Sequence, residues 1–111
     1  MSKYRAKKTE IDGITFDSKR EAERYCELKL MQKAGLINQL ELQPKFVLQE
    51  GFKKNGKAIR PITYKADFMY WDNKLKQTII EDVKGFETKE FKLKRKIFEA
   101  NYPELSLKTV R

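Results

Sequence analysis

The segment TIIEDVKG, at residues 78–85, contains the side chains best able to do chemistry in this sequence. Side chains alternate along a strand, so Asp82 and Lys84 share one face while Glu81 points to the other. The two isoleucines before them and the valine between them put apolar groups on both faces, which predicts a central strand covered on both sides. We therefore expect Asp82 and Lys84 to emerge together where a buried strand reaches the edge of the core.

A second carboxylate, Asp67, lies on the preceding strand of the predicted hairpin. A two-residue loop at Asn73 and Lys74 would put Asp67 opposite Ile80 and diagonal to Asp82, on the same face of the sheet. A three-residue loop would instead bring Glu81 to the face of Asp67. The loop length therefore decides which carboxylate joins Asp67.

Two carboxylates held close on a covered strand repel each other and are poorly solvated, which is costly unless a cation lies between them. The chain has no histidine and one cysteine, so hard oxygen ligands favour Mg²⁺ or Mn²⁺ over zinc. A lysine beside such a metal can stabilise negative charge that develops at a phosphate. This combination indicates phosphodiester hydrolysis. The alternative is that Asp82 and Lys84 form an ordinary solvated ion pair.

Glu21 is a candidate third carboxylate because it lies on the apolar stripe of a predicted helix, four residues before Tyr25 and seven before Leu28. Ser18, three residues earlier, forms a capping box with Glu21. Capping alone would also explain a glutamate at this position.

The elements that must position these residues follow from turn and helix signals. An Asp12-Gly13 turn predicts a small N-terminal hairpin, and a helix is expected from Glu21 to Ala34, ending at Gly35. Three successive strands are expected within residues 43–52, 58–71 and 75–85, the first two joined at Asn55-Gly56. A second helix over about 88–101 and a strand at 105–110 complete the order. This order predicts a single domain over residues 1–111 with an α/β (mixed α+β) fold, in which helices flank a mixed sheet and the last strand returns after a helical crossover.

The composition favours a polyanionic partner. Lys and Arg number 25 against 16 Asp and Glu, a net charge of +9 in 111 residues, and nucleic acid is the partner we expect. Three groups of cations could contact phosphates: Lys3, Arg5, Lys7 and Lys8; Lys53, Lys54, Lys57 and Arg60; and Lys89, Lys92, Lys94, Arg95 and Lys96. For each group alone, a solvated surface is the simpler interpretation. The aromatic residues Tyr64, Phe68, Tyr70 and Trp71 are expected to pack in the core rather than to stack on bases.

The remaining composition argues for a cytoplasmic protein. The one cysteine, Cys26, excludes an internal disulfide framework and is interpreted as structural. The N-terminal residues carry no apolar signal region, and no stretch is long and apolar enough to span a membrane, so no membrane association is expected.

The motifs FDSKREAERY, ITYKADFMYWD and IIEDVKG, in an αβββαβ order, resemble the PD-(D/E)xK nuclease superfamily. More closely, nearly the whole chain resembles small phage and prophage proteins of that superfamily, akin to Holliday junction resolvases and to the endonuclease subunits of some transposases. The sequence departs from the common pattern in having Ala66 in place of proline and Asp82 where glutamate is common.

The resemblance implies a restriction-endonuclease-like core in which Glu21, Asp67 and Asp82 bind Mg²⁺ or Mn²⁺ and Lys84 is the catalytic lysine. It implies a metal-dependent DNA endonuclease, with branched DNA in phage recombination or replication as the first substrate to test. Lys94 or Lys96 could replace the glutamine or tyrosine that some branches carry on the second helix. Cutting both strands of a junction symmetrically would call for a homodimer. The alternatives are a catalytically inactive DNA-binding or assembly module on the same fold, and an accessory factor that binds RNA or protein by charge alone.

Overall fold

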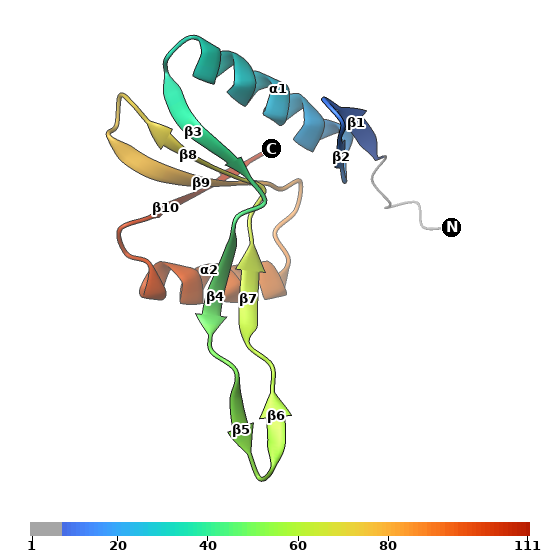
Figure 1. The fold of residues 1–111 in the computed structure, drawn as a ribbon, viewed down its shortest axis with the longest axis vertical. Coiled ribbons are helices and arrows are strands. Elements are labelled where there is room, and N and C mark those ends of the chain that lie inside the picture. Colours follow the sequence, from blue (N-terminus) through green and yellow to red (C-terminus); the bar gives the residue numbers. More distant parts are fainter. Residues whose placement is uncertain (1–7) are drawn as a thin grey trace.

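A computed structural model describes residues 8–111 and shows a mixed α+β fold built around one four-stranded sheet. Helices α1 (Lys19–Lys33) and α2 (Lys89–Asn101) lie on opposite sides of this sheet (Figure 1). The strand order is β10-β9-β8-β3, formed by Ser106–Val110, Gln77–Val83, Phe68–Asp72 and Ile37–Leu42. The predicted mixed sheet flanked by helices is confirmed.

Strand β9 is central, as its sequence predicts. It pairs antiparallel with β8 and parallel with β10, which returns to the sheet after the α2 crossover. Ile79 packs in the apolar cluster beneath α1, whereas Ile80 packs in the cluster beneath α2. Since the two neighbours face opposite helices, both faces of β9 are covered, and the polar residues that follow must emerge where this cover ends.

The N-terminal part of the described chain follows its turn and cap signals. Strands β1 (Thr9–Ile11) and β2 (Ile14–Phe16) form a hairpin whose turn residues Asp12 and Gly13 have φ values of 54° and 75°. The Ser18 side chain then caps α1 by accepting a hydrogen bond of 3.0 Å from the Glu21 N–H. The predicted hairpin and helix are confirmed, and this cap fixes Glu21 in the first turn of α1.

The predicted meander differs from the structure in one respect. The first predicted strand and the first half of the second pair with each other as expected, but they leave the main sheet and form a two-tiered arm (Figure 1), whereas the second half of the second strand is β8 of the main sheet. The inner tier pairs β4 (Lys45–Gln49) with β7 (Ile62–Lys65), and the outer tier pairs β5 (Phe52–Lys54) with β6 (Lys57–Ile59). The arm turns at Asn55 and Gly56, both with positive φ, as the sequence predicts.

The edge of the sheet is taken instead by β3, a strand that the sequence analysis did not predict. It pairs with β8 through a register shift between Asn38 and Glu41, and Gln39 has a φ of 58°. Such a bulge breaks the alternation of apolar and polar residues by which strands are recognised. Lys3, Arg5 and Lys7 of the first predicted cationic group lie outside the described residues. Neither described helix is long and apolar enough to cross a membrane.

Candidate functional site

The β8–β9 register decides which carboxylates meet. Phe68 pairs with Glu81 and Met69 with Ile80, so the connection spans residues 73–76 and the predicted two-residue loop is wrong. Asp72 stabilises the longer loop, because its Oδ1 accepts hydrogen bonds from the backbone N–H groups of Lys74 and Leu75, at 2.9 and 2.8 Å. The two-residue shift in pairing preserves which side chains share a face.

Asp67 lies in a bend directly before β8, at the point where the pairing with β9 ends. The Asp67 backbone N–H lies close enough to the Asp82 carboxylate to lower its pKa, so the two residues are neighbours although they are not a paired position of the sheet. The Asp67 N–H donates to the Glu81 carbonyl at 3.0 Å, and Asp67 Oδ2 accepts from the Val83 N–H at 2.7 Å. The Asp67 carboxylate thus accepts a hydrogen bond from the last residue of β9.

Asp82 is almost fully buried, with 2% of its surface exposed, and its Oδ2 accepts a hydrogen bond from the Tyr64 hydroxyl. Burial raises the pKa of Asp82 to about 6, against the opposing effects of Lys84 and the Asp67 backbone N–H. Burial likewise raises the pKa of Asp67, while the Val83 N–H and Lys84 oppose the rise. Both carboxylates are therefore held in surroundings that disfavour their charged form.

Glu21 reaches the same region from the first turn of α1. It is 6% exposed, and its pKa rises to about 7, chiefly through burial and then through repulsion from Asp67, Asp17 and Asp82. Lys65 partly opposes this rise. Asp67 and Asp82, which come from two other segments, thus both raise the pKa of Glu21, and Asp17 adds an exposed fourth acid that the sequence analysis missed.

Lys84 emerges on the α2 side of the sheet. Its Nζ lies 4.7 Å from the centroid of the Phe91 ring, a cation–π contact. Its charge lowers the pKa values of Asp67 and Asp82. The expectation that Lys84 accompanies Asp82 on one face therefore agrees with its contacts.

Glu81 is equally buried but has a full set of partners on the other face. Its Oε1 and Oε2 accept hydrogen bonds from Arg24 Nε and Nη2 at 2.9 and 2.6 Å. The Tyr70 hydroxyl donates to the same carboxylate. Glu81 is therefore one half of a bidentate buried ion pair that joins α1 to the sheet, and Asp82 is the carboxylate that joins Asp67.

The three predicted site carboxylates differ from Glu81 because no ion pair neutralises their charge. Across residues 8–111, neither Glu21, Asp67 nor Asp82 forms an ion pair with Lys or Arg. In that same range, no three His, Cys, Asp or Glu side chains are grouped as a metal-binding cage. Mg²⁺ usually takes only one or two protein carboxylates and completes its shell with water and substrate phosphate. Asp67 and Asp82 carry carboxylate oxygens, the donor type that Mg²⁺ prefers, whereas the sequence has no histidine and only one cysteine for a zinc cage.

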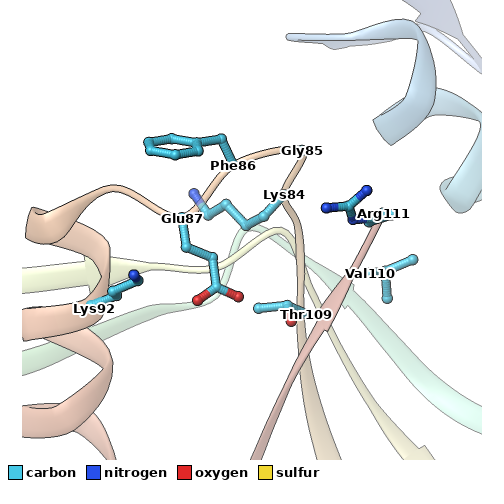
Figure 2. Close-up of a pocket in the computed structure, with 8 residues that line it drawn as sticks. All are labelled: Lys84, Gly85, Phe86, Glu87, Lys92, Thr109, Val110 and Arg111. Atoms are coloured by element: carbon cyan, nitrogen blue, oxygen red, sulfur yellow. The ribbon is translucent and has the colours of Figure 1, made fainter.

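Two hollows meet at Lys84. One, of about 330 Å³, lies between the β9–α2 loop, α2 and the end of β10, as Figure 2 shows; its lining includes Lys92 and Arg111. The other, of about 380 Å³, lies between β7 and α2, and its lining includes Lys65 and Lys94. Lys84 lines both hollows, and it is also the lysine whose charge acts on Asp67 and Asp82.

The predicted cations fall into two classes. The arm cations Lys53, Lys54, Lys57 and Arg60 are all exposed. On α2, Lys94 pairs with Glu90 at 3.4 Å, and Arg95 lies 3.8 Å from Glu87 and from Glu99, whereas Lys89, Lys92 and Lys96 are exposed. The arm and part of α2 thus present unneutralised positive charge.

Gly85 directly follows Lys84, and a glycine at such a position can permit a backbone turn or the close approach of a phosphate. Its φ lies outside the left-handed region, and a Cβ added there would meet open space. The turn therefore does not require glycine, and the phosphate approach stays a prediction.

Besides Asp17, sequence reasoning missed the roles of two side chains in this region. Tyr64 is buried, as expected for core packing, but its hydroxyl also serves Asp82. Arg24 neutralises Glu81. The available signal for Arg24 was its position three residues after Glu21, which puts both on neighbouring parts of one helix face. No comparable signal identified the partner of Tyr64, because β7 and β9 are not paired in the sheet.

Comparison with known proteins adds a family but no activity. A family model described as "Protein of unknown function (DUF1064)" matches residues 1–111, the whole chain. No curated protein and no solved structure matches this chain.

Proposed function

We propose that this chain, which belongs to the DUF1064 family, is a metal-dependent DNA endonuclease. The description of the family names no activity, so the proposal depends on the site alone. The single observation that supports this proposal is that Asp67 and Asp82 lie buried near Lys84 and both repel the buried Glu21, while none of the three acids forms an ion pair among residues 8–111. Desolvated carboxylates with raised pKa values are costly to a fold and typical of functional sites.

Each residue has a distinct role in this proposal. Asp67 and Asp82 would hold Mg²⁺ or Mn²⁺ through oxygens not already engaged by Val83 N–H and the Tyr64 hydroxyl. The bound ion would supply a Lewis acid and a more acidic water. Lys84 stabilises negative charge at the scissile phosphate. Glu21, with a pKa of about 7, can exchange a proton with water at neutral pH.

The arm provides the DNA contact that the net charge predicts. Residues 51–60 contain four cations and no acid, and every residue of this stretch is exposed. A two-stranded ribbon has a width that the DNA major groove admits, and its lysines would contact phosphates without reading sequence. A surface that only bound DNA would gain nothing from buried acids that repel phosphate, which disfavours an inactive binding module.

The test is cleavage of labelled linear, single-stranded and four-way-junction DNA with Mg²⁺, Mn²⁺ or EDTA. We expect metal-dependent cleavage by the wild type and none by Asp82→Asn. Lys84→Ala should lower the rate about 10²- to 10³-fold, as for loss of one group that stabilises transition-state charge. Asp82→Asn should keep or strengthen DNA binding in a gel-shift titration, since it removes a negative charge from the path of the phosphate.

Matched controls separate the site from general charge effects. Glu23→Gln changes an exposed acid on the same helix as Glu21, and Lys33→Ala removes an exposed cation from the last turn of that helix. Both controls should cleave like the wild type, whereas Glu21→Gln should be slower. Metal-independent cleavage, or equal cleavage by Asp82→Asn and the wild type, would refute the site. Binding without cleavage under every condition would favour the inactive module.

A further inference from the structure

The hollow on the β10 side of Lys84 combines positive charge with an exposed ring. Its lining includes Lys84, Lys92 and Arg111, against one acid, Glu87 (Figure 2). Within the described chain, neither Lys92 nor Arg111 forms an ion pair. The Glu87 carboxylate lies among the lining side chains (Figure 2) and is 3.8 Å from Arg95, a cation that does not line the hollow. The hollow therefore carries net positive charge available to a ligand.

Two hydrogen bonds to backbone carbonyls hold the walls of this hollow in place. The Lys84 N–H donates to the Val110 carbonyl at 2.7 Å, which holds the end of β10 against β9. Arg20 Nε of α1 donates to the Arg111 carbonyl at 2.7 Å. The volume of about 330 Å³ falls within the range of roughly 300–1,000 Å³ that small-ligand sites occupy.

Phe86 forms part of the same lining, on the loop between β9 and α2 (Figure 2). With 79% of its surface exposed, it is the most exposed large apolar residue of the described chain. A single exposed apolar residue needs no explanation by itself. A ring beside three cations, however, is the combination by which proteins bind single-stranded nucleic acid, with phosphates on the cations and a base stacked on the ring.

We propose that this hollow binds an unpaired nucleotide of DNA, with its phosphate between Lys84, Lys92 and Arg111 and its base stacked on Phe86. A fully paired duplex keeps its bases in the stack, so it cannot offer a free base face to Phe86. Because Lys84 also borders the carboxylate region, the bound strand would continue from the hollow toward Asp67 and Asp82. This last step rests on the proposed nuclease function and specifies its substrate as DNA with unpaired nucleotides beside the cut.

The test is fluorescence anisotropy in EDTA with a labelled single-stranded oligonucleotide and a fully paired duplex of the same sequence. Phe86→Ala should weaken single-strand binding about 5- to 150-fold, corresponding to loss of one stacked base, and should change duplex binding less than twofold. Phe86→Tyr, which keeps a ring, should bind like the wild type, and Phe86→Leu, which keeps only apolar surface, should bind like Phe86→Ala. Lys92→Ala should reduce the salt dependence of single-strand binding by about one phosphate contact.

Leu75→Ala is the matched control, since Leu75 is 58% exposed in the loop at the opposite end of β9. It should leave both affinities unchanged. Equal losses on single strand and duplex, no effect of Phe86→Ala, or full binding by Phe86→Leu would overturn the proposal. Because EDTA prevents cleavage, single-strand binding by a protein that never cuts would leave this inference standing while the nuclease proposal fails. If Phe86→Ala cleaved DNA at the rate of the wild type, the nuclease proposal would stand while this inference fails.

Discussion

Glu81 and Asp82 are neighbours on one central strand, both nearly inaccessible to solvent, yet the protein treats their charges in opposite ways. Glu81 receives two hydrogen bonds from Arg24 and one from Tyr70. Asp82 receives a tyrosine hydroxyl but no cation, and it shares its surroundings with Asp67. The comparison separates a carboxylate that an ion pair neutralises from one whose charge Lys84 offsets only in part. A ligand cation is the natural partner of the second kind.

The largest expected effect comes from breaking the ion pair between Arg24 and Glu81. Arg24→Ala should lower the free energy of unfolding by about 3–5 kcal/mol, because it leaves Glu81 buried without its counter-charge. Urea denaturation followed by circular dichroism measures this change. Asp82→Asn should instead leave the free energy of unfolding equal or higher, since it removes a buried charge that forms no ion pair.

The double variant Arg24→Met with Glu81→Gln is the control for this prediction. It removes both charges, keeps an acceptor for Tyr70, and should recover most of the stability lost in Arg24→Ala. If Arg24→Ala and Asp82→Asn destabilised the protein equally, the distinction between the two carboxylates would be wrong.

The pH dependence of stability should sharpen the same distinction. Glu21 rises from 4.5 to a pKa of about 7 and Asp82 from 3.8 to about 6, so the folded state binds protons more tightly than the unfolded state. Their contribution is complete below the unfolded pKa values and is lost as the pH rises through 6 to 7. Each group can contribute a slope of at most about 1.4 kcal/mol per pH unit. Thermal unfolding between pH 4 and pH 8 measures the loss.

Variants and metal identify the groups responsible. Glu21→Gln and Asp82→Asn should each flatten the curve, whereas Glu23→Gln should not. Mg²⁺ or Mn²⁺ should raise the unfolding temperature at pH 8 more than at pH 5, since protonated carboxyls are poor ligands. A wild-type stability that stays constant from pH 5 to pH 8 would contradict the raised pKa values.

The sequence predicted most of the elements because their signals are local. The Ser18 cap, the Asp12-Gly13 and Asn55-Gly56 turns, and the alternation around Ile80 each depend on a few adjacent residues. The prediction from sequence failed where tertiary contacts determine the structure. The bulge in β3 interrupts the alternation by which a strand is recognised, and the arm leaves the main sheet although its strands pair as expected.

The site was predictable to the extent that alternation determines it. Strand parity assigned Asp82 and Lys84 to one face and Glu81 to the other, and it survived a wrong loop length because the actual register differs by two residues rather than one. The partners of these residues were not predictable in the same way. Arg24 and Tyr64 come from elements whose placement against β9 depends on how helix and arm pack, which no local pattern records.

The smallest expected effect is at Gly85, and it tests whether space beside Lys84 serves the fold or a ligand. Because the added Cβ of Gly85→Ala would meet no protein atom and φ is unstrained, the variant should fold with equal stability or gain about 0.4–1 kcal/mol from a less flexible unfolded chain. If a phosphate approaches this backbone, the same methyl group should weaken DNA binding a few-fold in EDTA. Gly51→Ala offers the contrast, since its Cβ would lie 2.9 Å from the Ile59 carbonyl and should cost stability directly. A Gly85→Ala protein with normal stability and unchanged DNA affinity would show that no phosphate lies there, and would place the bound strand elsewhere along Lys84.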